Sequence, residues 1–294
     1  MSMRVTDTSA SLRSLANLQS TGSRLADLQA QMSSGNQITK PSDNPSGTVR
    51  ALELRGDLKR NTQYNAAATD AIGWLSAADA AYSQVVNLTQ NARTLVVKGL
   101  NNGASTGTSA GALADQIDAI RTSLISIANT AYNGRPVFGG TTTGAIAYDP
   151  AGNYVGDNGT VSRTVGDQNT VQINQNGPSI FGPPGNDLFA RLATISTTLR
   201  TNPSALGPQL SALDTALSSI SDAQAVEGAT YQRVQIAQST QQSTSTALQT
   251  QLSGIQDIDL ADMAIKVSTA NVTYQAALQT TASIRQMSLL NFLR

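Results

Sequence analysis

Apolar residues recur at helical spacing along most of the chain, and this periodicity limits what the chain can fold into. Residues 12–32 place leucines at steps of three, four or seven, and residues 206–255 keep one heptad-like frame with a polar middle. Such spacing gathers the apolar side chains on one helix face, which another helix must cover. The sequence therefore predicts a mainly α fold, an elongated helical bundle or coiled coil.

The periodicity is first interrupted by QMSSGNQITKPSDNPSG, residues 31–47. Two prolines each remove a backbone donor and disfavour helix at the residue before them, and two glycines let the backbone turn. We expect residues 33–47 to separate one helix from the next. The residues that carry this expectation are Gly35, Pro41, Asn44, Pro45 and Gly47.

A second interruption lies near the other end of the chain. The apolar frame steps by five from Ile255 to Leu260, where a heptad steps by four, so the apolar stripe turns toward a new partner. Helix capping explains the aspartates of residues 254–262 better than a metal site does, because their spacing is not that of a calcium loop. The residues expected to form this second interruption are Gly254, Asp257 and Asp259.

The two interruptions and one change in amino-acid composition divide the chain into five predicted parts. Residues 141–186 are rich in Gly, Thr, Asn and Pro, with short β-favouring runs between turn signals, so a small inserted β domain is expected. Either Asn186 or Asp187 can cap the helix that follows. The predicted parts are an N-terminal helix (1–38), the two halves of a helical bundle (39–138 and 187–256), a β domain (139–186) and a C-terminal helix (257–294).

The last predicted helix has few charges. From Val267 to Arg294 its only charged residues are Arg285 and Arg294, and Ile265 and Val272 add a second apolar stripe. Two paired terminal helices cannot bury apolar residues on several sides, so we expect copies of the chain to pack against one another there. The predicted assembly interface comprises Leu12, Leu15, Leu18, Leu25, Leu28, Met32, Met263, Val267, Tyr274, Leu278, Ile284, Leu290 and Leu293.

Several classes of function are disfavoured by composition. The chain has no Cys and no His, and it carries no nucleotide-binding or hydrolase motif, so neither enzyme chemistry nor a cofactor or metal is expected. A formal net charge of +0 argues against a nucleic-acid partner, and no segment has the unbroken apolar length of a membrane span. Aromatic residues make up only 4%, which predicts a core of Leu, Ile, Val and Ala. Nothing places Glu53 or Glu227, the only glutamates, beside an acid–base partner.

Three stretches resemble a known family. QMSSGNQITKPSDNPSG resembles the N-terminal signature of bacterial flagellins, NLTQNARTLVVKGLNNG (87–103) resembles the stretch that follows it, and the end AIKVSTANVTYQAALQTTASIRQMSLLNFLR resembles the flagellin C-terminus. The middle, with NGRPVFGG and IFGPPGNDLFARLATISTTLR, is more similar to the hook–filament junction proteins of this superfamily, the hook-associated proteins.

The resemblance implies a structural subunit of the bacterial flagellum that joins the hook-associated ring to the flagellin filament. It implies self-assembly into a helical ring, with another hook-associated protein on the hook side and flagellin on the filament side. It also implies an extracellular location, export without a cleavable signal peptide, and an export chaperone on the C-terminal helix. One alternative is a short flagellin that forms the filament itself; another is a secreted adhesin on a helical stalk.

Overall fold

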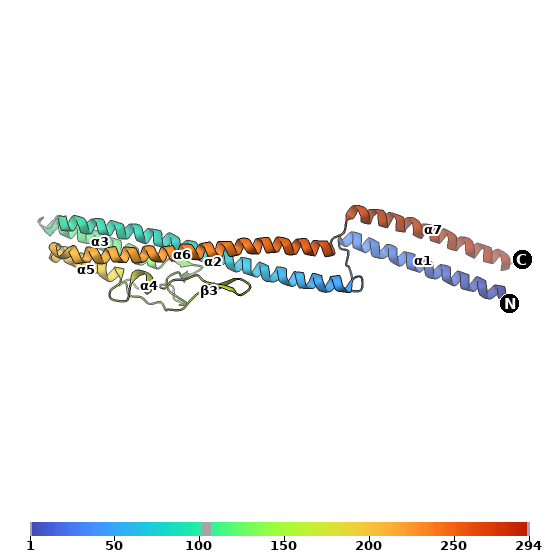
Figure 1. Cartoon of the computed structure of the whole chain (residues 1–294), viewed down its shortest axis with the longest axis horizontal. Coiled ribbons are helices and arrows are strands. Elements are labelled where there is room, and N and C mark those ends of the chain that lie inside the picture. Colours follow the sequence, from blue (N-terminus) through green and yellow to red (C-terminus); the bar gives the residue numbers. More distant parts are fainter. Residues whose placement is uncertain (1, 102–106, 293–294) are drawn as a thin grey trace. The chain divides into compact units, whose positions relative to one another are not determined.

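Helices dominate the computed structural model of the chain (Figure 1). The structure describes the backbone of residues 2–101 and 107–292, and the side chains of residues 9, 12–101 and 109–283. The helices are α1 (Ser2–Ser34), α2 (Pro45–Asn101), α3 (Gly107–Ala128), α4 (Gly177–Phe181), α5 (Leu188–Thr201), the 3-10 turn η1 (Pro203–Leu206), α6 (Gly207–Gln256) and α7 (Leu260–Phe292). The strands are β1 (Ala131–Tyr132), β2 (Arg135–Pro136), β3 (Ser162–Gly166) and β4 (Asn169–Gln172). The prediction of a mainly α fold is confirmed.

The chain forms two compact units. The terminal unit contains residues 1–59 and 245–294, and the central unit contains residues 60–244. Helices α2 and α6 each contribute to both units.

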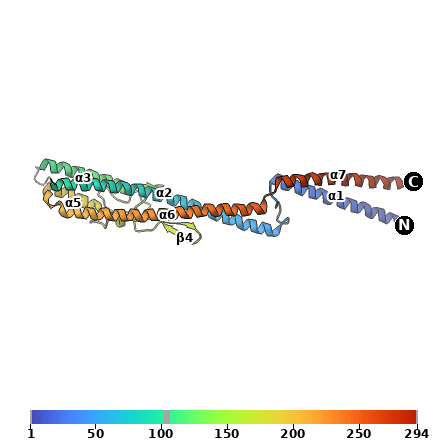
Figure 2. The same ribbon diagram turned by 45° about the horizontal axis from the view of Figure 1, so that its top comes forward.

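In the terminal unit, α1 and α7 lie side by side, as two views of the molecule show (Figures 1 and 2). The two helices come from opposite ends of the chain, so the predicted pairing of the terminal helices is confirmed.

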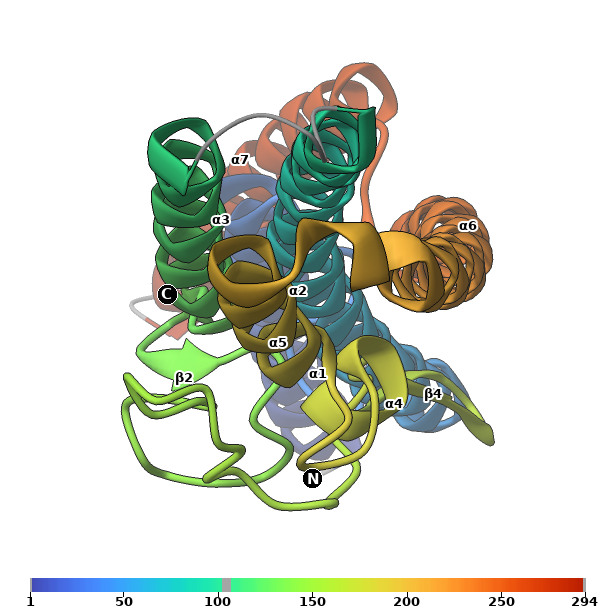
Figure 3. The same cartoon turned by 90° about the vertical axis from the view of Figure 1, so that its left-hand side faces the viewer.

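The central unit packs α3 against α5, and it places the inserted region with β2, α4 and β4 to one side of the helices (Figure 3). Its core is continuous from Ala68 on α2 to Ala237 on α6. Side chains early in α2 bond to side chains late in α6, and side chains late in α2 bond to side chains early in α6. The two helices therefore run antiparallel. The pairs are Asn61–Gln241, Thr69–Gln238, Asp79–Gln224 and Arg93–Asp214.

The inserted region contains less strand than its sequence suggests. β3 and β4 form an antiparallel hairpin, as the runs VSRTV and TVQI predict. The runs AIAY and NYVG give only an isolated bridge between Tyr148 and Tyr154. A second small hairpin, β1–β2, lies in residues 131–136, before the expected start of the β region. The turn at Asn133 and Gly134, both with positive φ, folds the chain back on itself in this hairpin.

The core is also more aromatic than expected. Few aromatic residues are present, but several gather in one buried cluster of edge-to-face and tilted rings, which adds stabilisation beyond burial. The members are Tyr82, Phe138, Tyr148, Tyr154, Phe181 and Phe189. The core contains the predicted Leu, Ile, Val and Ala side chains, and this aromatic cluster adds to them.

Short polar side chains fix where three helices begin. Asn44 Oδ1 accepts a hydrogen bond from Gly47 N (2.9 Å) at the start of α2, and Asp187 Oδ1 accepts one from Ala190 N (2.9 Å) at the start of α5. Asp259 Oδ1 accepts one from Ala261 N (2.9 Å) before α7. Each satisfies a donor that the first turn of a helix leaves free. The predicted capping roles of Asp187 and Asp259 are confirmed.

Candidate assembly surface and joint

The predicted assembly residues fall into two groups on α1 and α7. The first group lies in the seam between the two helices, where Met263 is buried and its neighbours are half-buried. Only part of each apolar side chain is removed from water, as expected when two helices pack without a third. The seam residues are Leu18, Leu25, Leu28, Met263, Val267 and Tyr274.

Gly22 sits at a close approach within this seam. A Cβ placed at Gly22 would lie 3.2 Å from Cε2 of Tyr274, closer than an ordinary van der Waals contact. Because glycine has no side chain, the ring of Tyr274 can pack directly against α1 at this position. From the sequence alone this glycine reads only as an interruption of a helix.

The second group of predicted residues remains exposed. Leu12 is 62% exposed, and Leu15, Met32 and Leu278 are about 40% exposed. Ile265 and Val272, the second stripe on α7, are 66% and 65% exposed. These two lie seven residues apart and share one face of α7, on the side away from Met263, Val267 and Tyr274. The terminal unit thus presents apolar side chains that its own two helices do not cover.

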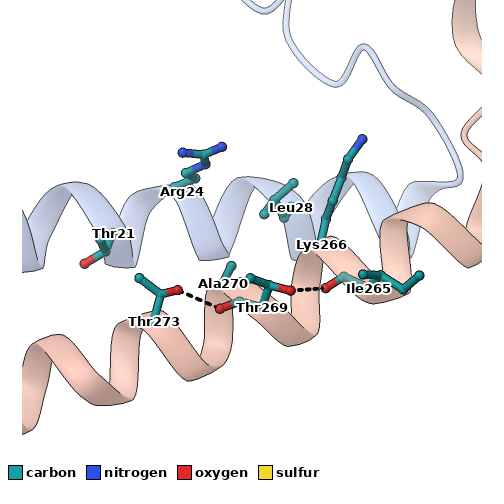
Figure 4. Close-up of a pocket in the computed structure, with 8 residues that line it drawn as sticks. All are labelled: Thr21, Arg24, Leu28, Ile265, Lys266, Thr269, Ala270 and Thr273. Carbon is teal, nitrogen blue, oxygen red and sulfur yellow. Dashed lines mark hydrogen bonds between the residues drawn. The ribbon is translucent and has the colours of Figure 1, made fainter.

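A groove of about 340 Å³ opens between α1 and α7. Thr21, Arg24 and Leu28 line it from α1, and in Figure 4 Thr21 points toward α7 while the end of the Arg24 side chain extends away from α7. The residues from α7 are Ile265, Lys266, Thr269, Ala270 and Thr273. The hydroxyls of Thr269 and Thr273 donate to carbonyls one turn earlier in their own helix, at 2.9 and 2.8 Å. With both hydroxyls engaged, the groove presents mainly methyl groups and aliphatic side chains.

Three predicted interface residues cannot be placed in either group. The side chains of Ile284 and Leu290, and the whole of Leu293, lie outside the described residues.

The two interruptions meet in space within the terminal unit. Asn36 and Asp257 form an antiparallel bridge. Gln37 N donates to Gln256 O (2.6 Å), and Ile258 N donates to Gly35 O (3.3 Å). We call the two segments, residues 33–47 and 254–262, the joint. Backbone bonds thus tie together segments more than 200 positions apart in the sequence.

A polar turn completes the N-terminal side of the joint. Asp43 Oδ2 accepts hydrogen bonds from Lys40 N (2.8 Å), Thr39 N (3.1 Å) and Thr39 Oγ1 (2.9 Å). Hydrogen bonds from Lys40 and Thr39 hold the pKa of Asp43 below its usual value. Lys40 in turn pairs with Asp27 on α1 at 3.1 Å.

The non-helical part of the joint is shorter than the sequence suggests. Gly35, with φ +69°, follows the end of α1, and Pro41 lies in the turn that Asp43 organises. Pro45 and Gly47 belong to the first turn of α2, and Gly254 lies inside α6, so these three do not interrupt a helix. Proline fits that first position because its missing N–H would have no partner there. A Cβ at Gly47 would lie 2.6 Å from Asn44 Nδ2, so a larger residue here would displace the capping asparagine side chain.

Sequence analysis missed the residues that make the backbone contacts of the joint. Asn36, Gln37 and Gln256 carry no sequence signal, because their contribution comes from backbone atoms. Arg55 Nη2 also donates to Gln256 Oε1 at 3.2 Å, which holds α2 beside the end of α6.

Among the described residues, none of the helices is both long and apolar enough to cross a bilayer. In the same part of the chain, no three acidic side chains converge as a metal site would require. Asp257 instead accepts a hydrogen bond from Ser253 Oγ (2.5 Å), and Asp262 pairs with Lys266 (2.6 Å).

Comparison with known proteins identifies the family. The model of the bacterial flagellin N-terminal helical region matches residues 5–143, and that of the bacterial flagellin C-terminal helical region matches residues 210–293. Flagellar hook-associated protein 3 of Salmonella typhimurium is 33% identical over 189 residues, which cover 59% of each chain. The Escherichia coli protein of the same name is 31% identical over 186 residues, or 58% of each chain. The matches thus span less than two thirds of the length of these relatives.

Solved structures share the fold. A flagellar hook-associated protein from Vibrio parahaemolyticus has a TM-score of 0.67 at 18% identity, covering 73% of this chain and all of that one. FlgL from Bacillus cereus has a TM-score of 0.60 at 20% identity, covering 68% of this chain and 99% of that one. Because both of its terminal helical regions match the flagellin models, the chain belongs to the flagellin superfamily.

Proposed function

We propose that the chain is a structural, non-enzymatic subunit of the bacterial flagellum that joins the hook-associated ring to the flagellin filament. It assembles through α1 and α7 into a helical ring of copies. Contacts of this kind are head-to-tail, so each copy leaves a surface free for the next element of the lattice.

The observation that carries the proposal is the apolar surface left open on the paired terminal helices. Ile265 and Val272 are each about two thirds exposed, and Leu12 and Leu260 are similarly exposed on the same pair. Exposed apolar stripes of this kind mark surfaces that another protein covers. Neighbouring copies would remove these side chains from water, which favours association by roughly 25 cal/mol for each Å² buried.

The names of the relatives support a proposal about the partners. Two relatives are named flagellar hook-associated protein 3, and a solved neighbour from Legionella pneumophila is described as a flagellar junction protein. We infer contact with another hook-associated protein on the hook side and with flagellin on the filament side. Export without a cleavable signal peptide, aided by a chaperone on α7, belongs to the same proposal.

The alternative is a short flagellin that forms the filament itself. A flagellin of Bacillus subtilis is 27% identical over 141 residues, a shorter and weaker match than the two hook-associated proteins give. The junction role is therefore the better supported of the two.

Immunogold labelling of intact flagella distinguishes the two roles. We expect antibody against the central unit to place gold at the boundary between hook and filament, at one site per flagellum. A strain that lacks the gene is the matched control and should show no label there. Gold along the whole filament would overturn the junction role in favour of the flagellin role.

A further inference from the structure

A cavity of about 350 Å³ lies between α2 and α6 in the central unit. Its lining comes only from these two antiparallel helices. The residues are Leu75, Ser76, Asp79 and Ala80 from α2, and Glu227, Gly228, Tyr231 and Gln232 from α6. The cavity is open to solvent on the side of the exposed Asp79 and Gln232, and Glu227 closes its inner end.

Glu227 is a buried acidic residue on a face of α6 whose other buried residues are apolar. Its stripe on α6 continues to Ala223 and Val234, which are both buried, and Glu227 itself is only 3% exposed. Its Oε2 accepts one long hydrogen bond, 3.4 Å from Gln175 Nε2. Its Oε1 is buried and has no hydrogen-bond partner among the described residues. A carboxylate in this place lacks the donors that a buried negative charge requires.

The described groups around Glu227 include no positively charged side chain that could donate hydrogen bonds to it. α2 contributes Asp79, which is negative, and the buried hydroxyl of Tyr82; the inserted region contributes Gln175, and α6 itself contributes Tyr231. Burial raises the pKa of Glu227 to about 7; the hydrogen bond from Gln175 lowers this pKa, and the charge of Asp79 adds a smaller increase. Burial and the Glu227 charge also raise the pKa of Tyr82, so its hydroxyl keeps its proton.

Gln175 makes Glu227 part of a connection between α6 and the inserted region. Gln175 Nε2 donates to Ala223 O on α6 (2.8 Å) as well as to Glu227. The preceding residue, Asn174, is buried and bonds to Val161 N (2.7 Å) and Gly159 O (2.9 Å). The segment after β4 is thus tied on one side to the inserted region and on the other side to α6 at Glu227.

We propose that Glu227 is a proton-operated lock that fastens the segment after β4, residues 173–176, to α6. With its proton, Glu227 is a neutral side chain that can remain buried at the inner end of the cavity. When the proton leaves, the carboxylate requires water at this buried end, which favours separation of the segment from α6. The lock is closed at acidic pH and loosens through neutral pH.

The direction of the pH dependence follows from the linkage between proton binding and folding. In an unfolded chain the Glu227 carboxyl would titrate at its ordinary value of 4.5, and in the folded chain it titrates near 7. The folded state therefore holds the proton more tightly. The stabilisation from this group is complete below pH 4.5 and is lost as the pH rises through 7.

Hydrogen exchange of the Gln175 side-chain amide, which donates to Ala223 O and Glu227 Oε2 on α6, tests the lock. We expect protection factors, corrected for the intrinsic exchange rate, to fall about tenfold between pH 6 and pH 8 in the unmodified chain. Glu227→Gln keeps the size of the side chain without the charge and should show no such fall. Asp79→Asn is the matched control at the exposed edge of the cavity and should retain most of it.

One further variant keeps the test decisive if Glu227→Gln does not fold. Glu227→Leu fits the apolar stripe and should also remove the pH dependence. A flat profile in the unmodified chain, or an unchanged fall in both Glu227 variants, would overturn the proposal.

Discussion

Replacing Ile265 and Val272 together by aspartate is expected to abolish assembly and to leave the free chain folded. Both side chains are about two thirds exposed in the single chain, so the change removes almost no internal packing. In an assembly the new carboxylates would be buried without partners, which costs several kcal/mol. Even about 3 kcal/mol would weaken association more than a hundredfold. Thermal unfolding of the free chain and its incorporation into flagella measure the two effects.

The matched control for this double variant is Asn271→Asp. It adds a carboxylate at an exposed polar position of the same helix, away from the stripe that Ile265 and Val272 form. We expect it to assemble normally. If the double variant assembles as well as this control, the stripe on α7 is not an assembly surface.

Two glycines inserted after Asn44 are expected to give loose or absent junctions while export continues. The insertion separates Asn44 from Gly47 N, so α2 loses its cap. It also lengthens the chain between the start of α2 and Gly35 and Gln37, whose backbone atoms bond to the other segment of the joint. The start of α2 would then no longer be held at a fixed distance from the other segment of the joint. Motility and electron microscopy of the hook–filament boundary give the readout.

The same insertion after Gly144 serves as the control. Gly144 lies in an exposed turn of the inserted region, where added residues are usually tolerated. A strain with this control should swim normally. Normal swimming by the Asn44 insertion strain as well would mean that residues 33–47 are an ordinary surface loop.

Much of the terminal unit could be predicted because its signals are local. The leucine spacing of residues 12–32 and the frame from Met263 to Tyr274 indicate two apolar stripes, and the structure pairs the two helices with part of each stripe in the seam between them. The step of five between Ile255 and Leu260 coincides with the end of α6 and the start of α7. Spacing, proline and glycine act on neighbouring residues, so the sequence carries these features directly.

The features that escaped prediction depend on contacts between distant segments. The bridge of Asn36 with Asp257 uses backbone atoms, which every residue possesses, so no side-chain pattern announces it. The aromatic cluster joins Tyr82 on α2 to Phe138 in the inserted region, and composition cannot show that rare residues gather at one place. Glu227 did carry a signal, because a charged residue occupies an apolar frame, but its buried surroundings arise only from the packing of α6 on α2.

The chemical accessibility of Val272 in free and assembled chains tests the central claim most directly. The chain has no cysteine, so Val272→Cys introduces a single thiol, and Thr143→Cys gives a reference thiol in an exposed loop. We predict that a maleimide reagent labels both variants in the free chain, and that in isolated hook–filament junctions it labels only the Thr143→Cys thiol. Equal labelling of both thiols in assembled junctions would contradict the account, because the stripe on α7 would then remain in contact with water.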